Sequence, residues 1–272
     1  MHVSALYIYP VKGTAAVAVS NAATCPTGFV DDRRWMIVDE HGRFLSQREH
    51  RRLALVRANV AGDTLELGAR GMSTLRVEDA RAGEPTFASV WADETEALRL
   101  PAAAAEWISD FLGIRAAIVY MPDTTRRHIH PDYDREARIV SFADAFPFLL
   151  ISQESLDELN RRLEQPIEMI RFRPNIVVAG APEPHSEDRW KRILCGEVEL
   201  DVVKGCARCS VPTVDPATAE IGKEPNRTLA TYRRIGGQVY FGQNLIHRNS
   251  GIMRVGDAVS VREVARTAQP TV

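Results

Sequence analysis

The stretch Val3-Ser-Ala-Leu-Tyr-Ile-Tyr9 opens the chain in the pattern of a β-strand. It is rich in aromatic and β-branched residues, which favour strands. It is followed by Pro10, which cannot donate a hydrogen bond to a neighbouring strand. We therefore predict a strand over residues 3–9 and a turn at Val11-Lys12-Gly13.

Further segments of this kind occur along the whole chain. Two hairpins are predicted in the first hundred residues, Arg34–Asp39 with Arg43–Ser46 and Leu53–Val60 with Thr64–Leu67. In the second half, strands are predicted at residues 148–151, 176–178, 198–203 and 258–264. Because strands and helices do not alternate regularly, the pattern predicts a β-rich α+β fold and not a doubly wound sheet.

Two helices are predicted between these strands. The first follows Pro101, where four alanines have high helix propensity and an apolar stripe stops at Gly113. The second is predicted to begin at a capping box, Ser155-x-x-Glu158, with leucines at helical spacing behind it.

The stretch from Met121 to Arg138 is polar and contains two histidines and Pro131, so it is predicted to be an exposed linker or lid. The domain boundary is placed just before it. This gives an N-terminal β-rich domain of residues 1–120 and a second domain of residues 121–272. A surface role is expected for His128 and His130, because the histidines form no recognisable set of metal ligands.

The composition is that of a folded protein, with 45% hydrophobic and 26% charged residues. The 34 basic and 36 acidic residues nearly balance, which argues against a nucleic-acid or anionic-membrane partner. The first residues show no basic region followed by an apolar run, and no window approaches the roughly 18 consecutive apolar residues of a membrane helix. We therefore expect a cytoplasmic protein.

The most informative segment for chemistry is Lys204-Gly-Cys-Ala-Arg-Cys-Ser-Val-Pro-Thr-Val-Asp-Pro216. Two cysteines bracket an arginine directly after a predicted strand. A thiolate is the form that attacks or binds a metal, and a neighbouring guanidinium stabilises it. Cys206 or Cys209 is therefore a candidate reactive thiol.

Other interpretations of this segment have to be weighed. A structural zinc site normally needs four ligands, and there is no second Cys-x-x-Cys. A thioredoxin-like dithiol normally opens a helix, which Pro212 and Pro216 disfavour here. Two inert cysteines on a loop stay open as an interpretation of this segment taken alone.

A second group of candidates is basic and dispersed along the chain. It comprises Lys12, Arg33 beside Arg34 and Trp35, and Arg173. Arginine can bind phosphate through two hydrogen bonds and lysine through a point charge, so a phosphate site would form if these residues converge. Taken singly, each could equally be a solvated charge or a salt-bridge partner.

Three segments together resemble the MOSC family, which is named for the C-terminal domain of molybdenum-cofactor sulfurase. They are Tyr7-Ile-Tyr-Pro-Val-Lys12 with Asp32-Arg-Arg-Trp35, Phe172-Arg-Pro-Asn-Ile-Val177, and Cys206-Ala-Arg-Cys209 with Thr213-Val-Asp-Pro216. The resemblance covers nearly the whole chain. It implies a MOSC β-barrel-like domain packed against an N-terminal β-rich domain.

Within that family the sequence is most similar to the mitochondrial amidoxime-reducing component and its bacterial relatives. The resemblance implies a molybdenum cofactor, reduction of small N-hydroxylated substrates, and Cys209 as the catalytic residue and metal ligand, with Cys206 not ligating. It also implies that Asp144 flanks the pterin, and that the pterin and its phosphate are held by Lys12, Arg33, Arg173, Asn175 and Arg208.

The chain departs from the family pattern at three places: Gly13, Ala145-Phe146 and Ala207. Each departure removes a side-chain hydrogen-bond donor. No further cysteines follow Cys209, so electrons are expected from a separate donor protein of ferredoxin-like, flavin or cytochrome type. Two rival functions stay open: a cofactor carrier or sulfur-transfer module without turnover, and a metal-free dithiol redox protein.

Overall fold

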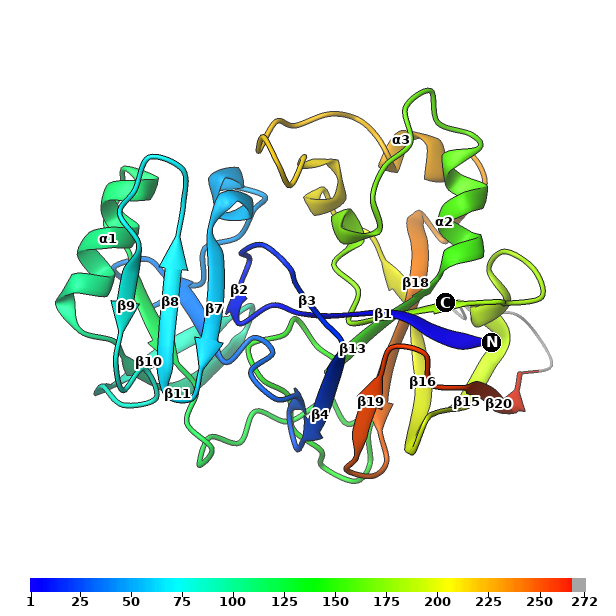
Figure 1. The fold of residues 1–272 in the computed structure, drawn as a ribbon, viewed down its shortest axis with the longest axis horizontal. Coiled ribbons are helices and arrows are strands. Elements are labelled where there is room, and N and C mark those ends of the chain that lie inside the picture. The colour runs from blue at the N-terminus through cyan, green and yellow to red at the C-terminus, as the bar shows by residue number, and fades with distance from the viewer. Residues whose placement is uncertain (266–272) are drawn as a thin grey trace.

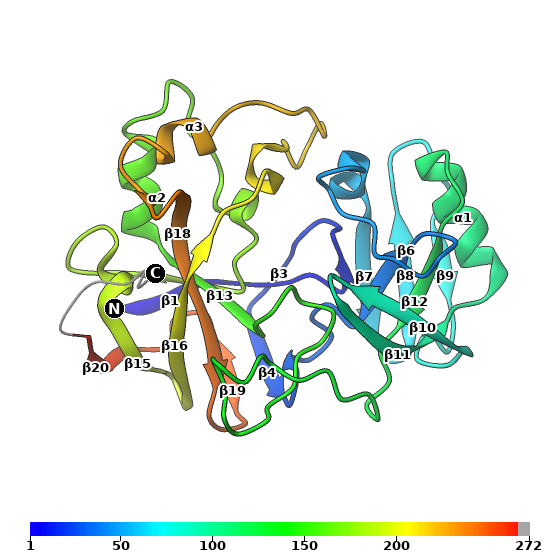
Figure 2. The ribbon, with the colours of Figure 1, turned by 180° about the vertical axis from the view of Figure 1, so that it is seen from behind.

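The computed structural model describes residues 1–265 and shows a strand-rich protein with two lobes (Figures 1 and 2). The predicted β-rich α+β class is confirmed. Residues 266–272, which end the predicted second domain, lie outside the described part. In that described part, no helix combines the length and apolar character needed to cross a lipid bilayer.

The larger lobe is built on a sheet that contains nine strands within residues 1–265. Its order is β20-β15-β16-β18-β13-β14-β1-β3, with β17 paired to β18. The strands are β1 (His2–Ile8), β3 (Val17–Val19), β13 (Phe148–Ser152), β14 (Ile176–Ala179), β15 (Trp190–Cys195), β16 (Val198–Ala207), β17 (Arg234–Ile235), β18 (Gln238–His247) and β20 (Val259–Val264). A small sheet beside it has the order β19-β4-β5, made by β4 (Asn21–Cys25), β5 (Gly28–Phe29) and β19 (Ile252–Arg254).

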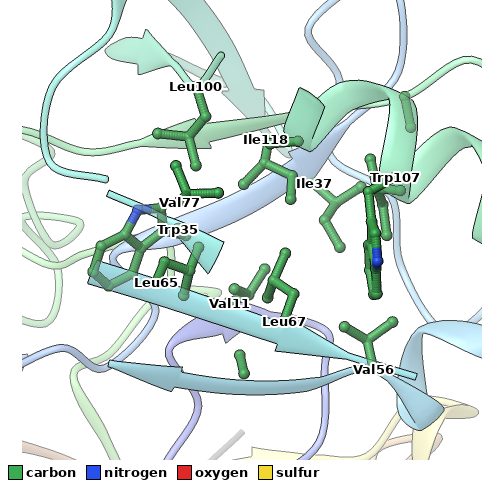
Figure 3. Packing of buried hydrophobic residues seen from close by; sticks show 14 of the residues in the cluster. Val11, Trp35, Ile37, Val56, Leu65, Leu67, Val77, Leu100, Trp107 and Ile118 are labelled. Atoms are coloured by element: carbon green, nitrogen blue, oxygen red, sulfur yellow. The ribbon is translucent and has the colours of Figure 1, made fainter. Parts of the chain in front are cut away.

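The smaller lobe has a five-stranded sheet of order β10-β11-β12-β6-β2 and a three-stranded sheet of order β7-β8-β9. Its strands are β2 (Val11–Lys12), β6 (Trp35–Val38), β7 (Arg57–Ala61), β8 (Thr64–Gly68), β9 (Leu75–Val77), β10 (Glu84–Val90), β11 (Asp93–Arg99) and β12 (Ala117–Tyr120). Figure 3 shows its core, in which side chains from these sheets pack together around Trp35, Leu67 and Trp107. Burial of such large apolar groups is the main stabilising term for the lobe.

The chain crosses between the two lobes near the N-terminus. The first strand, β1, pairs antiparallel with β14 and β3 in the large sheet, and the chain then enters the small lobe at β2. Residues 1–19 therefore contribute strands to the sheet of the C-terminal half, although they precede the predicted boundary between residues 120 and 121. That boundary stays a prediction, and the nine-stranded sheet and the β19-β4-β5 sheet each contain strands from both sides of it.

Of the two predicted helices, one begins and ends as predicted and the other begins earlier than predicted. Helix α1 spans Ala102–Leu112 and ends at Gly113, whose φ of 75° is the left-handed conformation that favours glycine. Helix α2 spans Gln153–Asn160, and its N-cap is Ser152, whose Oγ accepts a hydrogen bond from the backbone N–H of Ser155. The predicted capping box at Ser155 is therefore wrong by three residues, since the cap lies at the end of β13.

The short helices of the fold are single turns. They are α3 (Asn226–Leu229) and the 3₁₀ turns Arg51–Leu55, Met169–Phe172, Ser186–Arg189 and Val211–Thr213. The 3₁₀ turn Arg51–Leu55 corrects the predicted strand at 53–60, because the strand in this region, β7, begins only at Arg57. Leu53 lies in this helical turn and is fully buried in the small-lobe core.

Three further predictions are corrected. The predicted hairpin partner at 43–46 is reduced to isolated bridges, because β6 is paired instead with β12 and β2. Residues 11 and 12, predicted as part of a turn, form β2, and the turn lies at Gly13 with φ 86°. Strand β16 runs on to Ala207, so Cys206 lies in a strand that was predicted to end at residue 203.

The polar stretch 121–138 contains no helix or named strand, as predicted, and most of it is exposed, but several of its residues are buried. Thr125, Arg127, Ile129 and Asp134 are each less than 10% exposed, so the prediction of an exposed linker or lid is wrong for these positions. The two histidines of the stretch are exposed, as expected. Its buried residues are held by the hydrogen bonds described below.

Candidate functional site

A cavity of about 330 Å³ is formed by residues of both lobes. All seven residues singled out from the sequence line it: Lys12, Arg33, Asp144, Arg173, Asn175, Arg208 and Cys209. They come from β2, from the loops before β6 and β13, from the connection between the 3₁₀ turn at 169–172 and β14, and from the segment directly after β16. The fold thus brings together residues that are almost 200 positions apart in the sequence.

Lys12 and Asp144 form an ion pair in the wall of this cavity. Lys12 Nζ lies 2.6 Å from Asp144 Oδ1 and 2.7 Å from the carbonyl oxygen of Phe142. Burial lowers the pKa of Lys12, and the carboxylate of Asp144 only partly offsets this. The Asp144 side chain is two-thirds exposed, at 67%, and the nearby cations hold its pKa below the usual range despite some desolvation.

Arg33 and Arg173 stack on the same aromatic ring. Their guanidinium carbons lie 4.6 and 4.2 Å from the ring centroid of Tyr9, which is fully buried. Both arginines have a left-handed backbone, with φ of 53° and 58°. Burial lowers the pKa of Arg173 to about 10. For Arg33 burial acts in the same direction, but the adjacent Asp32 carboxylate outweighs it and the pKa is raised.

Asn175 is buried and its amide is already engaged by the protein. Its Oδ1 accepts hydrogen bonds from Arg33 Nη1 at 3.1 Å and from the backbone N–H of Leu149 at 3.3 Å, and its Nδ2 donates to the carbonyl of Tyr7 at 3.2 Å. The side chain therefore fixes the orientation of Arg33 and ties together the strands that carry the cavity wall.

The two cysteines of the Cys-x-x-Cys segment differ in their contacts. Arg208 Nη1 lies 3.0 Å from Cys206 Sγ, and Nη2 donates to the carbonyl of Phe172 at 2.8 Å. The guanidinium thus donates a hydrogen bond to the sulfur of Cys206. The pairing of β16 with β18 shifts register between Gly205 and Ala207, and such irregularities often re-aim side chains near functional sites.

Both cysteines are free thiols with intermediate burial. Asn226 Nδ2 donates to the backbone carbonyl of Cys209 at 2.7 Å, which anchors the segment after β16. By contrast, Cys195 is buried in the large-lobe core, where burial raises its pKa to about 12. Residues 1–265 contain no group of three or more histidine, cysteine, aspartate or glutamate side chains placed to hold a metal.

Sequence reasoning missed two kinds of residue at this site. Arg127 is buried and donates to the carbonyls of Ser141, Ala143 and Asp144 at 2.9, 2.6 and 3.0 Å, so it shapes the loop that carries Asp144. Nothing in its polar surroundings in the sequence signals burial. The aromatic lining residues Phe44 and Trp91 were also not expected at the cavity.

The residues present fit a phosphate-bearing cofactor with a soft metal. Nε of Arg208 is buried without a hydrogen-bond partner, and the cavity carries more cationic than anionic side chains. The thiol of Cys209 is a soft donor of the kind that binds thiophilic metals. The positions that depart from the family pattern, Gly13, Ala145-Phe146 and Ala207, also line the cavity. The side-chain hydrogen-bond donors that the family pattern has at these positions are therefore absent from the cavity wall.

Comparison with known proteins identifies both halves of the chain. The MOSC N-terminal beta barrel domain matches residues 1–115, and the MOSC domain matches residues 137–260. Mitochondrial amidoxime-reducing component 1 of Homo sapiens is 34% identical, over 94% of this chain and 82% of the relative. Mitochondrial amidoxime reducing component 2 of Rattus norvegicus is 33% identical with the same coverage. Molybdenum cofactor sulfurase of Arabidopsis thaliana is 29% identical, over 89% of this chain and 32% of its own length.

Proposed function

This chain belongs to the MOSC family, and from that premise we propose that it is a molybdenum-cofactor oxidoreductase that reduces small N-hydroxylated compounds. Family membership and its named relatives indicate a function related to the molybdenum cofactor. The reductase activity is proposed from the names of the amidoxime-reducing relatives, which share about a third of their residues with this chain.

The observation that carries the proposal is the convergence of cationic and amide side chains with Cys209 on one cavity. Its volume of about 330 Å³ lies in the range of small-molecule sites, which is roughly 300–1,000 Å³. Cys209 would ligate the metal, and Lys12, Arg33, Arg173 and Arg208 would bind the pterin and its phosphate. Asn175 would act through its hydrogen bond to Arg33.

The proposed reaction converts an N-hydroxylated group to the corresponding amine or amidine. One substrate molecule takes up two electrons and two protons and releases one water as the N–O bond breaks. When bound, the cofactor supplies the two-electron redox chemistry. The protein contributes a positive, partly desolvated site that favours binding of an anionic cofactor, because attraction between charges increases as water is excluded.

The electrons come from a separate donor protein in this proposal. The donor is proposed to be of ferredoxin-like, flavin or cytochrome type. No nucleic-acid or membrane partner is included, and a cytoplasmic location is part of the proposal. The near balance of charges, with a formal net charge of -2, supports this choice of partners.

The test is metal and pterin analysis of protein co-expressed with the molybdenum-cofactor pathway, together with reduction of benzamidoxime by a chemical electron donor. We expect near-stoichiometric molybdenum and turnover in the wild type, and loss of both in Cys209→Ser. Cys206→Ser should retain molybdenum. Cys25→Ser is a matched control, because Cys25 is a free thiol that does not line the cavity.

Each alternative outcome has a distinct meaning. Molybdenum without turnover would favour the carrier or sulfur-transfer function. A reversible Cys206–Cys209 disulfide in metal-free protein would favour the dithiol redox function. Absence of molybdenum, when a control protein is loaded in the same cells, would rule out the cofactor proposal.

A further inference from the structure

Trp91 occupies an unusual position at the cavity. It is the first residue of the two-residue turn between β10 and β11, where Val90 pairs with Asp93. Its backbone has φ 57°, in the left-handed region that is unfavourable for residues other than glycine, asparagine and aspartate. Glycine is the usual choice at such a turn position. A large side chain held in a left-handed turn conformation at a cavity is a candidate for a functional role.

The indole is ordered by polar and aromatic contacts but remains accessible. The guanidinium carbon of Arg48 lies 4.4 Å from its ring, and the Phe44 ring packs against it at 4.7 Å with an interplanar angle of 72°. Its Nε1 lies 3.3 Å from Asp144 Oδ1. The residue is nevertheless 48% exposed and lines the cavity, so part of the ring is free to contact a ligand.

The other three tryptophans have structural roles. Trp35, Trp107 and Trp190 are each no more than 8% exposed, and all three belong to core clusters. The indole N–H groups of Trp35 and Trp107 donate to backbone carbonyls at 2.8 and 2.7 Å. Trp91 is thus the tryptophan that is both accessible and placed at the candidate site.

We propose that Trp91, ordered by Arg48 and Phe44, forms a subsite that binds the flat aromatic group of the substrate. This inference rests on the proposed function and names its substrate class: aryl N-hydroxylated compounds are preferred over alkyl ones. Phe146 lines the same cavity from the loop that carries Asp144, which adds aromatic surface from the other lobe. Planar groups bind such surfaces by offset or edge-on stacking.

The first test compares benzamidoxime with acetamidoxime, which lacks the ring. An aromatic contact changes affinity by about threefold to tenfold. Trp91→Ala should therefore lower the ratio of kcat/KM for benzamidoxime to that for acetamidoxime by about this factor, mainly through KM, whereas Trp91→Phe should preserve most of the ratio. Phe87→Ala is the matched control, because Phe87 is an exposed aromatic residue of the same hairpin that does not line the cavity.

The second test does not depend on turnover. In cofactor-loaded protein without an electron donor, 4-nitrobenzamidoxime should quench tryptophan fluorescence saturably. Benzamidoxime should reverse the quenching, and acetamidoxime should not. Trp91→Phe should abolish it, because the remaining tryptophans are buried. This measurement separates the two proposals. Quenching without reductase activity would support the aromatic subsite at Trp91 and contradict the proposed reductase activity.

The inference is overturned by any of three results. One is an equal change for the aryl and alkyl substrates in Trp91→Ala. Another is quenching that persists in Trp91→Phe. The third is loss of pterin from Trp91→Ala at unchanged folding, which would place the indole on the cofactor and not on the substrate.

Discussion

Lys12 Nζ lies 2.6 Å from Asp144 Oδ1, and this contact joins β2 in the small lobe to the loop before β13 in the large one. The lysine is nearly buried and the aspartate is largely exposed, with side-chain exposures of 9% and 67%. Solvent therefore screens the charge of Asp144 but hardly reaches that of Lys12. Its main consequence is the placement of a positive charge in the cavity wall, and its contribution to stability is small.

Lys12→Met should separate cofactor binding from stability. Asp144 remains solvated, but the buried carbonyl of Phe142 loses its Lys12 donor, so the free energy of unfolding should fall by roughly 1–2 kcal/mol. The pterin content of co-expressed protein should fall severalfold, since a cation that binds phosphate is removed. Urea titration and pterin analysis check this, with the exposed Lys191→Met as control. A proportional loss of stability and pterin would indicate a purely structural lysine.

Arg127→Met should be strongly destabilising. The substitution leaves the carbonyls of Ser141, Ala143 and Asp144 without this donor, and each unsatisfied buried acceptor costs roughly 1–3 kcal/mol, reduced where water can enter. We expect a loss of about 2–4 kcal/mol in urea titrations. Arg126→Met is the control, because Arg126 is exposed and donates only to carbonyls within three residues of itself. Equal effects of the two substitutions would contradict this assignment.

Glu187→Ala should destabilise the start of α2. Glu187 is fully buried and accepts hydrogen bonds from Ser152 N, Ser152 Oγ and Ser155 Oγ at 3.1, 2.8 and 2.7 Å. Its removal leaves several donors unpaired, which predicts a loss of about 2–4 kcal/mol in chemical unfolding. Glu183→Ala is the comparison, since that carboxylate is 58% exposed and pairs only at the surface. A loss of less than about 1 kcal/mol in Glu187→Ala would count against this network.

His185 and Asp188 should give opposite pH dependences of stability. Burial, assisted by Arg233, lowers the pKa of His185 to about 4, so the unfolded chain takes up its proton first and stability falls as pH drops from about 6.5 to 4. Burial raises the pKa of Asp188 to about 6 although Arg233 opposes it. The folded state therefore binds that proton first, and stability rises as pH drops from about 6 to 4.

Single substitutions should reveal these two slopes. Relative to the wild type, His185→Phe should make the change in stability between pH 6.5 and 4 more favourable by on the order of 1–2 kcal/mol, and Asp188→Asn should make it less favourable by a similar amount. The phenylalanine keeps an aromatic ring against Phe241, whose centroid lies 5.9 Å from that of His185. Thermal unfolding at several pH values checks both. Parallel pH profiles of the two variants would refute the assignment.

Local chemistry made some elements predictable. Helix α1 matched its prediction because high-propensity alanines, an apolar stripe and a terminal glycine all act within one segment. The cap of α2 was misplaced because two serines lie three residues apart, and the choice between them depends on where β13 ends. The burial of Arg127 was missed because its partners are carbonyls that the sequence pattern does not mark.

By itself, the sequence determined the β-rich class, the family and seven of the residues that line the cavity, because strand propensity and motif spacing can be read from the order of residues along the chain. Only the tertiary structure decided that β1 joins the sheet of the C-terminal half, that Arg208 contacts Cys206, and that Trp91 lies at the cavity wall. Each of these depends on contacts between residues remote in sequence or on backbone geometry set by strand pairing. Such geometry is fixed only when the whole chain packs.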